Sequence, residues 1–120
     1  NPIAAALGLE AINILKDEDL SDKSMQLGAY LKSQLDGIES DYITEIRGKG
    51  LWIGMDIDPQ KASAREVCER LKEKGLLCKE THETVVRFAP PLTITKDEID
   101  WAVVQIKDVL TAMKANNRAA

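Results

Sequence analysis

The stretch VVRFAPPL, residues 85–92, places an arginine inside an apolar segment that ends at two prolines. Alternation puts Arg87 on one face of a strand, between Val85 and Ala89, and the other apolar side chains on the opposite face. The apolar neighbours indicate a buried strand, and an arginine is almost never fully buried without an anionic partner. Arg87 therefore needs a carboxylate or a phosphate, from the protein or from a ligand.

Working outward from this strand, the same alternation recurs upstream. Strands are predicted at residues 42–47, 51–57, 76–79 and 84–89, separated by glycine, proline and polar residues. The second of these strands carries a complete apolar face, made by Leu51, Ile53, Met55 and Ile57. It joins the first through Gly48-Lys49-Gly50.

Two helices precede the strands. Asn1 is an N-cap acceptor, and the missing N–H of Pro2 costs nothing in a first turn. From Ile3 to Leu15 this helix is apolar nearly all round, which indicates burial in a larger body. Ser21 is the expected cap of the second helix, and Gly37 its C-terminal stop.

Two capping boxes predict the remaining helices, SARE at residues 63–66 and TKDE at residues 95–98. The last helix carries apolar side chains at helical spacing from Ile99 to Met113, and we expect its tail, residues 115–120, to fray. The order ααββαββα predicts an α+β domain, an antiparallel sheet of about four strands covered by helices.

Composition excludes several classes of function. The 120 residues suffice for one domain with a core. A net charge of −4 with dispersed cations gives no electrostatic footprint for nucleic acid or an anionic membrane. No apolar run approaches the roughly 20 residues of a membrane span. Two cysteines fit a reduced protein, so we expect a cytoplasmic or organelle-matrix location. The absence of an initial Met or leader indicates a piece of something longer.

Arg87 is the strongest candidate for a binding residue. Its planar, permanently charged fork suits bidentate capture of a carboxylate. The alternative is a structural ion pair at a sheet rim, because paired charges are often structural. The local pattern leaves both interpretations open.

The other candidate residues favour structural interpretations. His82 has no second histidine or cysteine at metal-ligand spacing, so it is interpreted as a loop residue. Asp56 and Asp58 are interpreted as a solvated face, and residues 48–50 as a hairpin turn, because the strand-loop-helix context of a phosphate-binding loop is absent.

The cysteines also favour structural roles. Cys68 is interpreted as core filler on a helix, and Cys78 as part of a short strand. Neither has the electropositive setting of an activated thiol. The chain by itself therefore shows no catalytic set, no metal site and no cofactor site.

Several runs resemble one family. IRGKGL at 46–51, VCERL at 67–71, GLLCKETH at 75–82 and VRFAPPL at 86–92 are similar to the ornithine aminotransferases, within the class III aminotransferases. The likeness covers essentially the whole chain. It implies the C-terminal small domain, residues 1–120, of a fold-type I enzyme dependent on pyridoxal phosphate (PLP). Residues 1–17 would be an entry helix packing on the missing large domain, and 42–113 the sheet-and-helix core.

The resemblance implies a role for Arg87. In the family, the matching arginine binds the α-carboxylate of glutamate or 2-oxoglutarate, and a glutamate of the large domain holds it when ornithine is bound. The full enzyme would convert L-ornithine and a 2-oxo acid to glutamate 5-semialdehyde and glutamate, as a homodimer at least. The Schiff-base lysine and the other PLP ligands lie upstream of Asn1, so the isolated chain should be inactive and hold no PLP firmly.

Two alternative functions remain open. Acetylornithine and 4-aminobutyrate aminotransferases share the Arg-Gly-Lys-Gly turn and the arginine before Pro-Pro. A stand-alone regulatory module that binds an amino acid through Arg87 is a different class of hypothesis, supported only by the likeness of the order from Tyr42 onward to a permuted ferredoxin-like unit.

Overall fold

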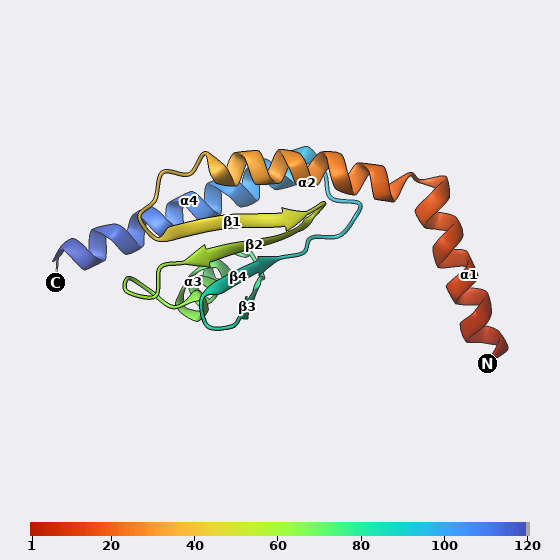
Figure 1. Ribbon diagram of the computed structural model, residues 1–120, viewed down its shortest axis with the longest axis horizontal. Coiled ribbons are helices and arrows are strands. Elements are labelled where there is room, and N and C mark those ends of the chain that lie inside the picture. Colours follow the sequence, from red (N-terminus) through yellow and green to blue (C-terminus); the bar gives the residue numbers. More distant parts are fainter. Residues whose placement is uncertain (120) are drawn as a thin grey trace.

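The computed structural model describes residues 1–119, with side chains described through residue 115. The described residues form four helices and a four-stranded antiparallel sheet in the predicted order ααββαββα, which confirms the α+β prediction; Figure 1 shows their arrangement. The elements are α1 (Pro2–Asp17), α2 (Leu20–Asp36), β1 (Ile43–Lys49), β2 (Trp52–Ile57), α3 (Ala64–Glu73), β3 (Lys79–Thr81), β4 (Val85–Phe88) and α4 (Lys96–Ala119).

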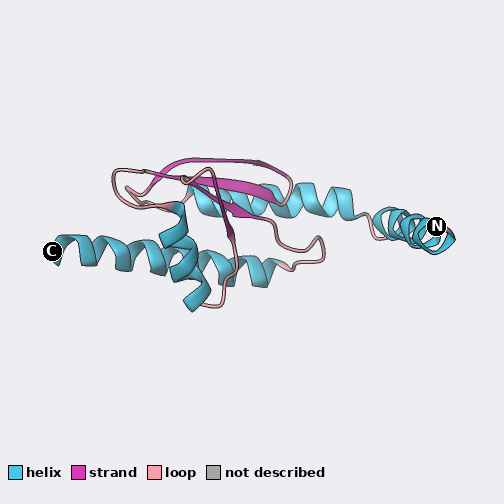
Figure 2. Cartoon of the chain, turned by 90° about the horizontal axis from the view of Figure 1, so that it is seen from below, coloured by secondary structure: helices cyan, strands magenta, loops and turns pink. Residues whose placement is uncertain are grey.

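The sheet has the strand order β1-β2-β4-β3. All three strand pairs are antiparallel, and β2 and β4 occupy the centre. Helices α2, α3 and α4 lie together on one face of this sheet, and no helix of the described residues covers the other face (Figure 2). We call these the covered face and the open face.

The covered face forms the hydrophobic core. The predicted apolar face of β2 is confirmed, since Leu51, Ile53, Met55 and Ile57 are all buried. They pack with side chains of α2, α3 and α4 in one continuous cluster. The core therefore explains why an alternating sequence folds as a sheet with one face under helices.

The capping box at the start of α4 forms completely, whereas at the start of α3 only the serine half forms and the Glu66 carboxylate pairs with Arg70. The Ser63 hydroxyl accepts a hydrogen bond from the Glu66 N–H at 3.1 Å, at the start of α3. The Thr95 N–H donates to the Glu98 carboxylate at 2.8 Å, and the Glu98 N–H donates to the Thr95 hydroxyl at 3.3 Å, at the start of α4. These bonds, reciprocal at α4 only, satisfy N–H groups that have no partner within the helix.

Two predicted boundaries are wrong. Helix α2 begins at Leu20 rather than after Ser21, and the residue before it, Asp19, is left-handed and makes no capping bond. Residues 76–78 of the predicted strand 76–79 are not in a strand; β3 is the polar segment Lys79–Thr81 instead. Its position is fixed by pairing with β4 across a tight turn, which outweighs the apolar character of the preceding residues.

Helix α1 extends away from the sheet and buries none of its residues within this chain (Figure 1). The predicted cap is present, because the Asn1 side-chain oxygen accepts from the Ile3 N–H at 3.0 Å. Ile3 and Leu7 are 72% and 67% exposed, so the apolar surface that the sequence places here has no cover in the described chain.

Helix α4 continues to Ala119. The fraying expected for residues 115–120 falls largely on side chains and a terminal residue that lie outside the described part of the chain. Within the described residues, no helix combines the length and the hydropathy needed to cross a bilayer.

Candidate functional site

Arg87 lies on the open face, in the middle of a row that runs across all four strands. The strand register places these residues opposite one another in the order Arg47, Gly54, Arg87 and Lys79. Directly opposed residues share a face of a sheet. The open face therefore carries three cations in one row, with a glycine between the first two.

The first cation of the row is neutralised. Arg47 forms an ion pair with Asp56 and lies 3.5 Å from a carboxylate oxygen of Glu45. The Asp56 side chain is only 18% exposed. The interpretation of Asp56 as part of a solvated face is therefore wrong: it is a partly buried partner of Arg47 on the neighbouring strand.

Arg87 differs from the other arginines whose side chains are described. Arg47, Arg65 and Arg70 each lie within ion-pair distance of a carboxylate. Arg87 is partly buried, and no ion pair or hydrogen bond of its guanidinium is present among the described residues. Its neighbour is the ring of Trp52, with 5.9 Å from the guanidinium carbon to the ring centroid. The structural ion pair that the sequence left open is therefore not formed within this part of the chain.

Lys79 completes the row at the edge of the sheet. Its side chain is 64% exposed, and its ammonium lies 3.3 Å from the Glu80 carboxylate. The pKa of Glu80 is lowered, first by a backbone hydrogen bond and then by hydrogen bonding to Lys79. Lys79 thus places a solvated positive charge beside Arg87, close to the Glu80 carboxylate.

The turn beside this row contains the only histidine. His82 and Glu83 both have positive φ, at 51° and 63°, and His82 is exposed, which confirms the loop interpretation. No group of three or more His, Cys, Asp or Glu that could hold a metal ion occurs among the described residues. The predicted hairpin between β1 and β2 is present, but its turn is Gly50–Leu51, because Gly48 and Lys49 belong to β1 and pair with Ile53 and Trp52.

Asp58, the other acidic candidate, makes its contacts within the loop after β2. Its carboxylate accepts from the Gln60 N–H at 2.9 Å and lies 3.8 Å from the Lys61 ammonium. Because both partners lie within three residues of it, Asp58 stabilises a local turn, and it lies apart from the row that contains Arg87.

The two cysteines interact, which the sequence did not predict. Cys68 is buried in the core, as predicted, whereas Cys78 precedes β3 instead of belonging to a strand. A hydrogen bond with Cys78 lowers the pKa of the Cys68 thiol. The same hydrogen bond, and then burial, raises the pKa of Cys78.

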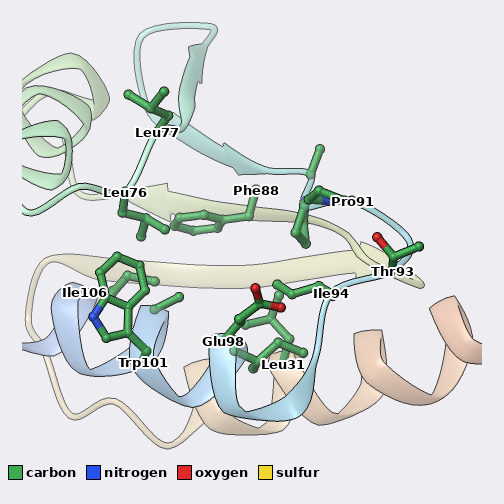
Figure 3. A pocket seen from close by; sticks show the side chains of 14 residues that line it. Leu31, Leu76, Leu77, Phe88, Pro91, Thr93, Ile94, Glu98, Trp101 and Ile106 are labelled. Atoms are coloured by element: carbon green, nitrogen blue, oxygen red, sulfur yellow. The ribbon is translucent and has the colours of Figure 1, made fainter.

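A groove lies between the sheet and α4, and Arg87 is not part of its lining. It has a volume of about 490 Å³, with Phe88 and Leu76 on the sheet side and Trp101 on the helix side (Figure 3). Its one carboxylate, Glu98, is engaged in the capping box, and hydrogen bonds from Thr95 lower its pKa. The other polar side chain of the lining is Thr93, and the remaining lining residues are apolar.

These observations define an α+β domain whose open sheet face carries a partly buried arginine without an ion-pair partner among the described residues. The chain matches the family described as aminotransferase class-III over residues 1–110, and it belongs to that family. Class III aminotransferases are PLP-dependent enzymes.

Individual relatives show which aminotransferases the chain resembles. The chain is 54% identical over 110 residues to the ornithine aminotransferase of Bacillus subtilis (strain 168), a match that covers 92% of the chain and 27% of the relative. It superimposes on the ornithine aminotransferase of Toxoplasma gondii, whose crystals contained partly occupied PLP, with a TM-score of 0.90 and 36% identity over 98% of the chain and 28% of that structure. It superimposes on the acetylornithine aminotransferase of Elizabethkingia anophelis with a TM-score of 0.88 and 36% identity. That match covers 93% of the chain and 30% of that structure.

The chain thus spans little more than a quarter of the length of the curated relatives that it matches. It corresponds to a segment of an aminotransferase, and its structural neighbours are aminotransferases of the same family.

Proposed function

We propose that this chain is the small domain of an ornithine aminotransferase, and that Arg87 binds the carboxylate of a substrate. The observation that carries the proposal is the state of Arg87: a partly buried guanidinium on an uncovered sheet face, without a carboxylate partner in the described chain. A partly desolvated fixed charge of this kind gains most from a bidentate anion. The 54% identity to an ornithine aminotransferase supplies the class of anion.

In the proposed reaction, the parent enzyme transfers the δ-amino group of L-ornithine to 2-oxoglutarate, giving glutamate 5-semialdehyde and glutamate. PLP, when bound, carries the amino group between the two half-reactions. The task of Arg87 is to fix the α-carboxylate of glutamate or 2-oxoglutarate, because the carboxylate position decides which carbon reaches the reacting centre. When ornithine is bound, a glutamate of the large domain would hold Arg87 instead.

The remaining parts of the proposal concern the parent enzyme. We place this domain at its C-terminal end, with α1 packed on the large PLP-binding domain or on the partner subunit of a homodimer. The exposed apolar surface of α1 supports such packing. The expected compartment is the cytoplasm, or the mitochondrial matrix in a eukaryote. Peptide mapping of the intact enzyme tests the placement: peptides of this chain at the N-terminal end would contradict it.

We propose that PLP is bound by the rest of the enzyme and not by this chain. The open face offers guanidinium and ammonium groups for a carboxylate, and its lysine, Lys79, is solvated rather than enclosed. A Schiff-base lysine works from a desolvated pocket. The isolated chain is therefore expected to transaminate nothing and to bind no PLP firmly; an absorbance band of bound PLP in this chain would contradict the assignment.

The decisive test is Arg87→Gln in the parent enzyme. Loss of a charge-assisted bidentate contact should lower kcat/KM for 2-oxoglutarate about 100- to 1,000-fold, and should change the ornithine half-reaction far less. Arg65→Gln is the matched control, because Arg65 is 71% exposed on α3 and pairs with Glu69. Equal kcat/KM values for 2-oxoglutarate in wild type and Arg87→Gln would overturn the proposal.

Acetylornithine aminotransferase is the second candidate function, favoured by the TM-score of 0.88 to such an enzyme. The two candidates share the use of Arg87 and differ in the amino donor. Steady-state rates of the parent enzyme with ornithine and with N-acetylornithine separate them: a preference for the acetylated donor would replace the first proposal without affecting the role of Arg87.

A further inference from the structure

Trp52 is an unusual residue for the place it occupies. Its side chain is 65% exposed at the start of β2, on the open face. The other large apolar side chains that the described chain leaves exposed lie on helices or in loops, such as Leu77 and Trp101. Among the described residues the indole is not part of the hydrophobic core, and the Arg87 guanidinium lies against its ring.

The register explains how the two side chains meet. Gly54 lies directly opposite Arg87, and Trp52 lies two residues before Gly54 on the same face. Because Gly54 has no side chain, the guanidinium of Arg87 can extend diagonally along β2 toward the indole. A diagonal pair of this kind is within reach of aromatic and long side chains.

An aromatic partner has a property that a carboxylate partner lacks. A cation over a ring is attracted by the quadrupole of the ring, and the attraction uses none of the N–H donors. A guanidinium has five such donors in a fixed fork. Trp52 can therefore hold the position of Arg87 and leave the fork available for an incoming carboxylate.

The register places two acids on the open face, Glu45 and Asp56, and neither pairs with this fork; Glu45 lies 3.5 Å from Arg47. Asp56 lies on the same strand as Trp52 and Gly54, opposite Val85, but its carboxylate is paired with Arg47 on the outer strand. Arg87 is consequently left with an aromatic neighbour on one side and no acceptor within the described chain.

We propose that Trp52 is a positioning residue for substrate carboxylate binding, acting through its contact with the Arg87 guanidinium. This inference rests on the proposed function, since it assumes that Arg87 binds the carboxylate. It adds a residue to that site: the indole restricts the guanidinium before the substrate arrives, so less conformational freedom is lost on binding. Loss of the indole should weaken the binding of the dicarboxylate substrate and leave the binding of ornithine unchanged.

The test uses the full-length enzyme loaded with PLP. Trp52→Leu keeps an apolar side chain but removes the aromatic face, and should raise KM for 2-oxoglutarate about two- to five-fold, with kcat and KM for ornithine unchanged. Trp52→Phe keeps a ring and should restore most of the wild-type KM. Trp101→Leu is the matched control, because Trp101 is 48% exposed on α4 and lines the groove away from Arg87.

A double-mutant cycle separates action through Arg87 from a general structural effect. In an Arg87→Gln background, Trp52→Leu should cause no further loss of kcat/KM for 2-oxoglutarate. An equal loss in both backgrounds, or an unchanged KM in Trp52→Leu while Arg87→Gln is impaired, overturns the role of Trp52 and leaves the proposed function intact. An unimpaired Arg87→Gln enzyme overturns both.

Discussion

The four residues of strand β4 place side chains alternately on the two faces of the sheet. Val86 and Phe88 are buried against helices on the covered face, whereas Val85 and Arg87 are partly buried on the open face. The covered face is apolar and closed by three helices. The open face carries charges in a row, and Arg87, at its centre, has no ion-pair partner in the described chain. The same alternation thus separates the side chains that hold the fold from those available to a ligand.

The largest effect on stability should come from the covered face. Met55 is fully buried at the centre of β2, opposite Val86 on β4. Met55→Ala should lower the free energy of unfolding by about 2–5 kcal/mol, because it removes a buried side chain and leaves a cavity. Urea unfolding of the chain measures the change. A loss below about 1 kcal/mol would show that the covered face is loosely packed.

A smaller but still large effect is expected where α2 crosses the turn between β1 and β2. A Cβ atom added at Gly28 would overlap the carbonyl group of Gly50. Gly28→Ala should therefore cost about 1–3 kcal/mol of stability, since backbone on both sides must shift. Gly8→Ala is the control, because nothing lies within 4 Å of a Cβ there. Equal unfolding midpoints for the two variants would contradict the close approach.

The cap of α4 should contribute less than the core. Thr95→Ala removes the hydroxyl that accepts from the Glu98 N–H, and should cost about 1 kcal/mol near neutral pH. Hydrogen bonds from Thr95 lower the pKa of Glu98, so its contribution is present above the ordinary carboxyl value of 4.5 and is lost as the pH falls through the folded-state value. The difference between wild type and Thr95→Ala in thermal unfolding should shrink below pH 4.5; a difference that grows there would contradict this cap.

Much of this arrangement was predictable because it follows from local patterns. Alternation located β2 and β4 and assigned the faces of Arg87 and Met55, and each capping box fixed the start of a helix. The strand β3 was misplaced because its polar residues carry no strand signal. Pairing with β4 places it, through a turn at His82 and Glu83 with two positive φ angles.

The parts of the site that sequence reasoning missed all depend on register. Neither the Arg47–Asp56 ion pair nor the approach of Trp52 to Arg87 follows from the face assignment of each strand alone. Both need the residue-by-residue pairing of β1, β2 and β4. Alternation from Ile53 already placed Trp52 on the open face, and that signal, an indole among charged residues, could have indicated a contact with Arg87.

The smallest effect on stability should come from the residue with the greatest proposed effect on activity. Arg87→Gln removes a charge that has no ion-pair partner in the described chain, so its free energy of unfolding should stay within about 0.5 kcal/mol of wild type. Urea unfolding of this variant and of Met55→Ala under the same conditions gives the contrast between the two faces directly. A loss of 2 kcal/mol or more, on the order of a core substitution, would show that Arg87 supports the fold, and the division between a covered face for stability and an open face for binding would then be wrong.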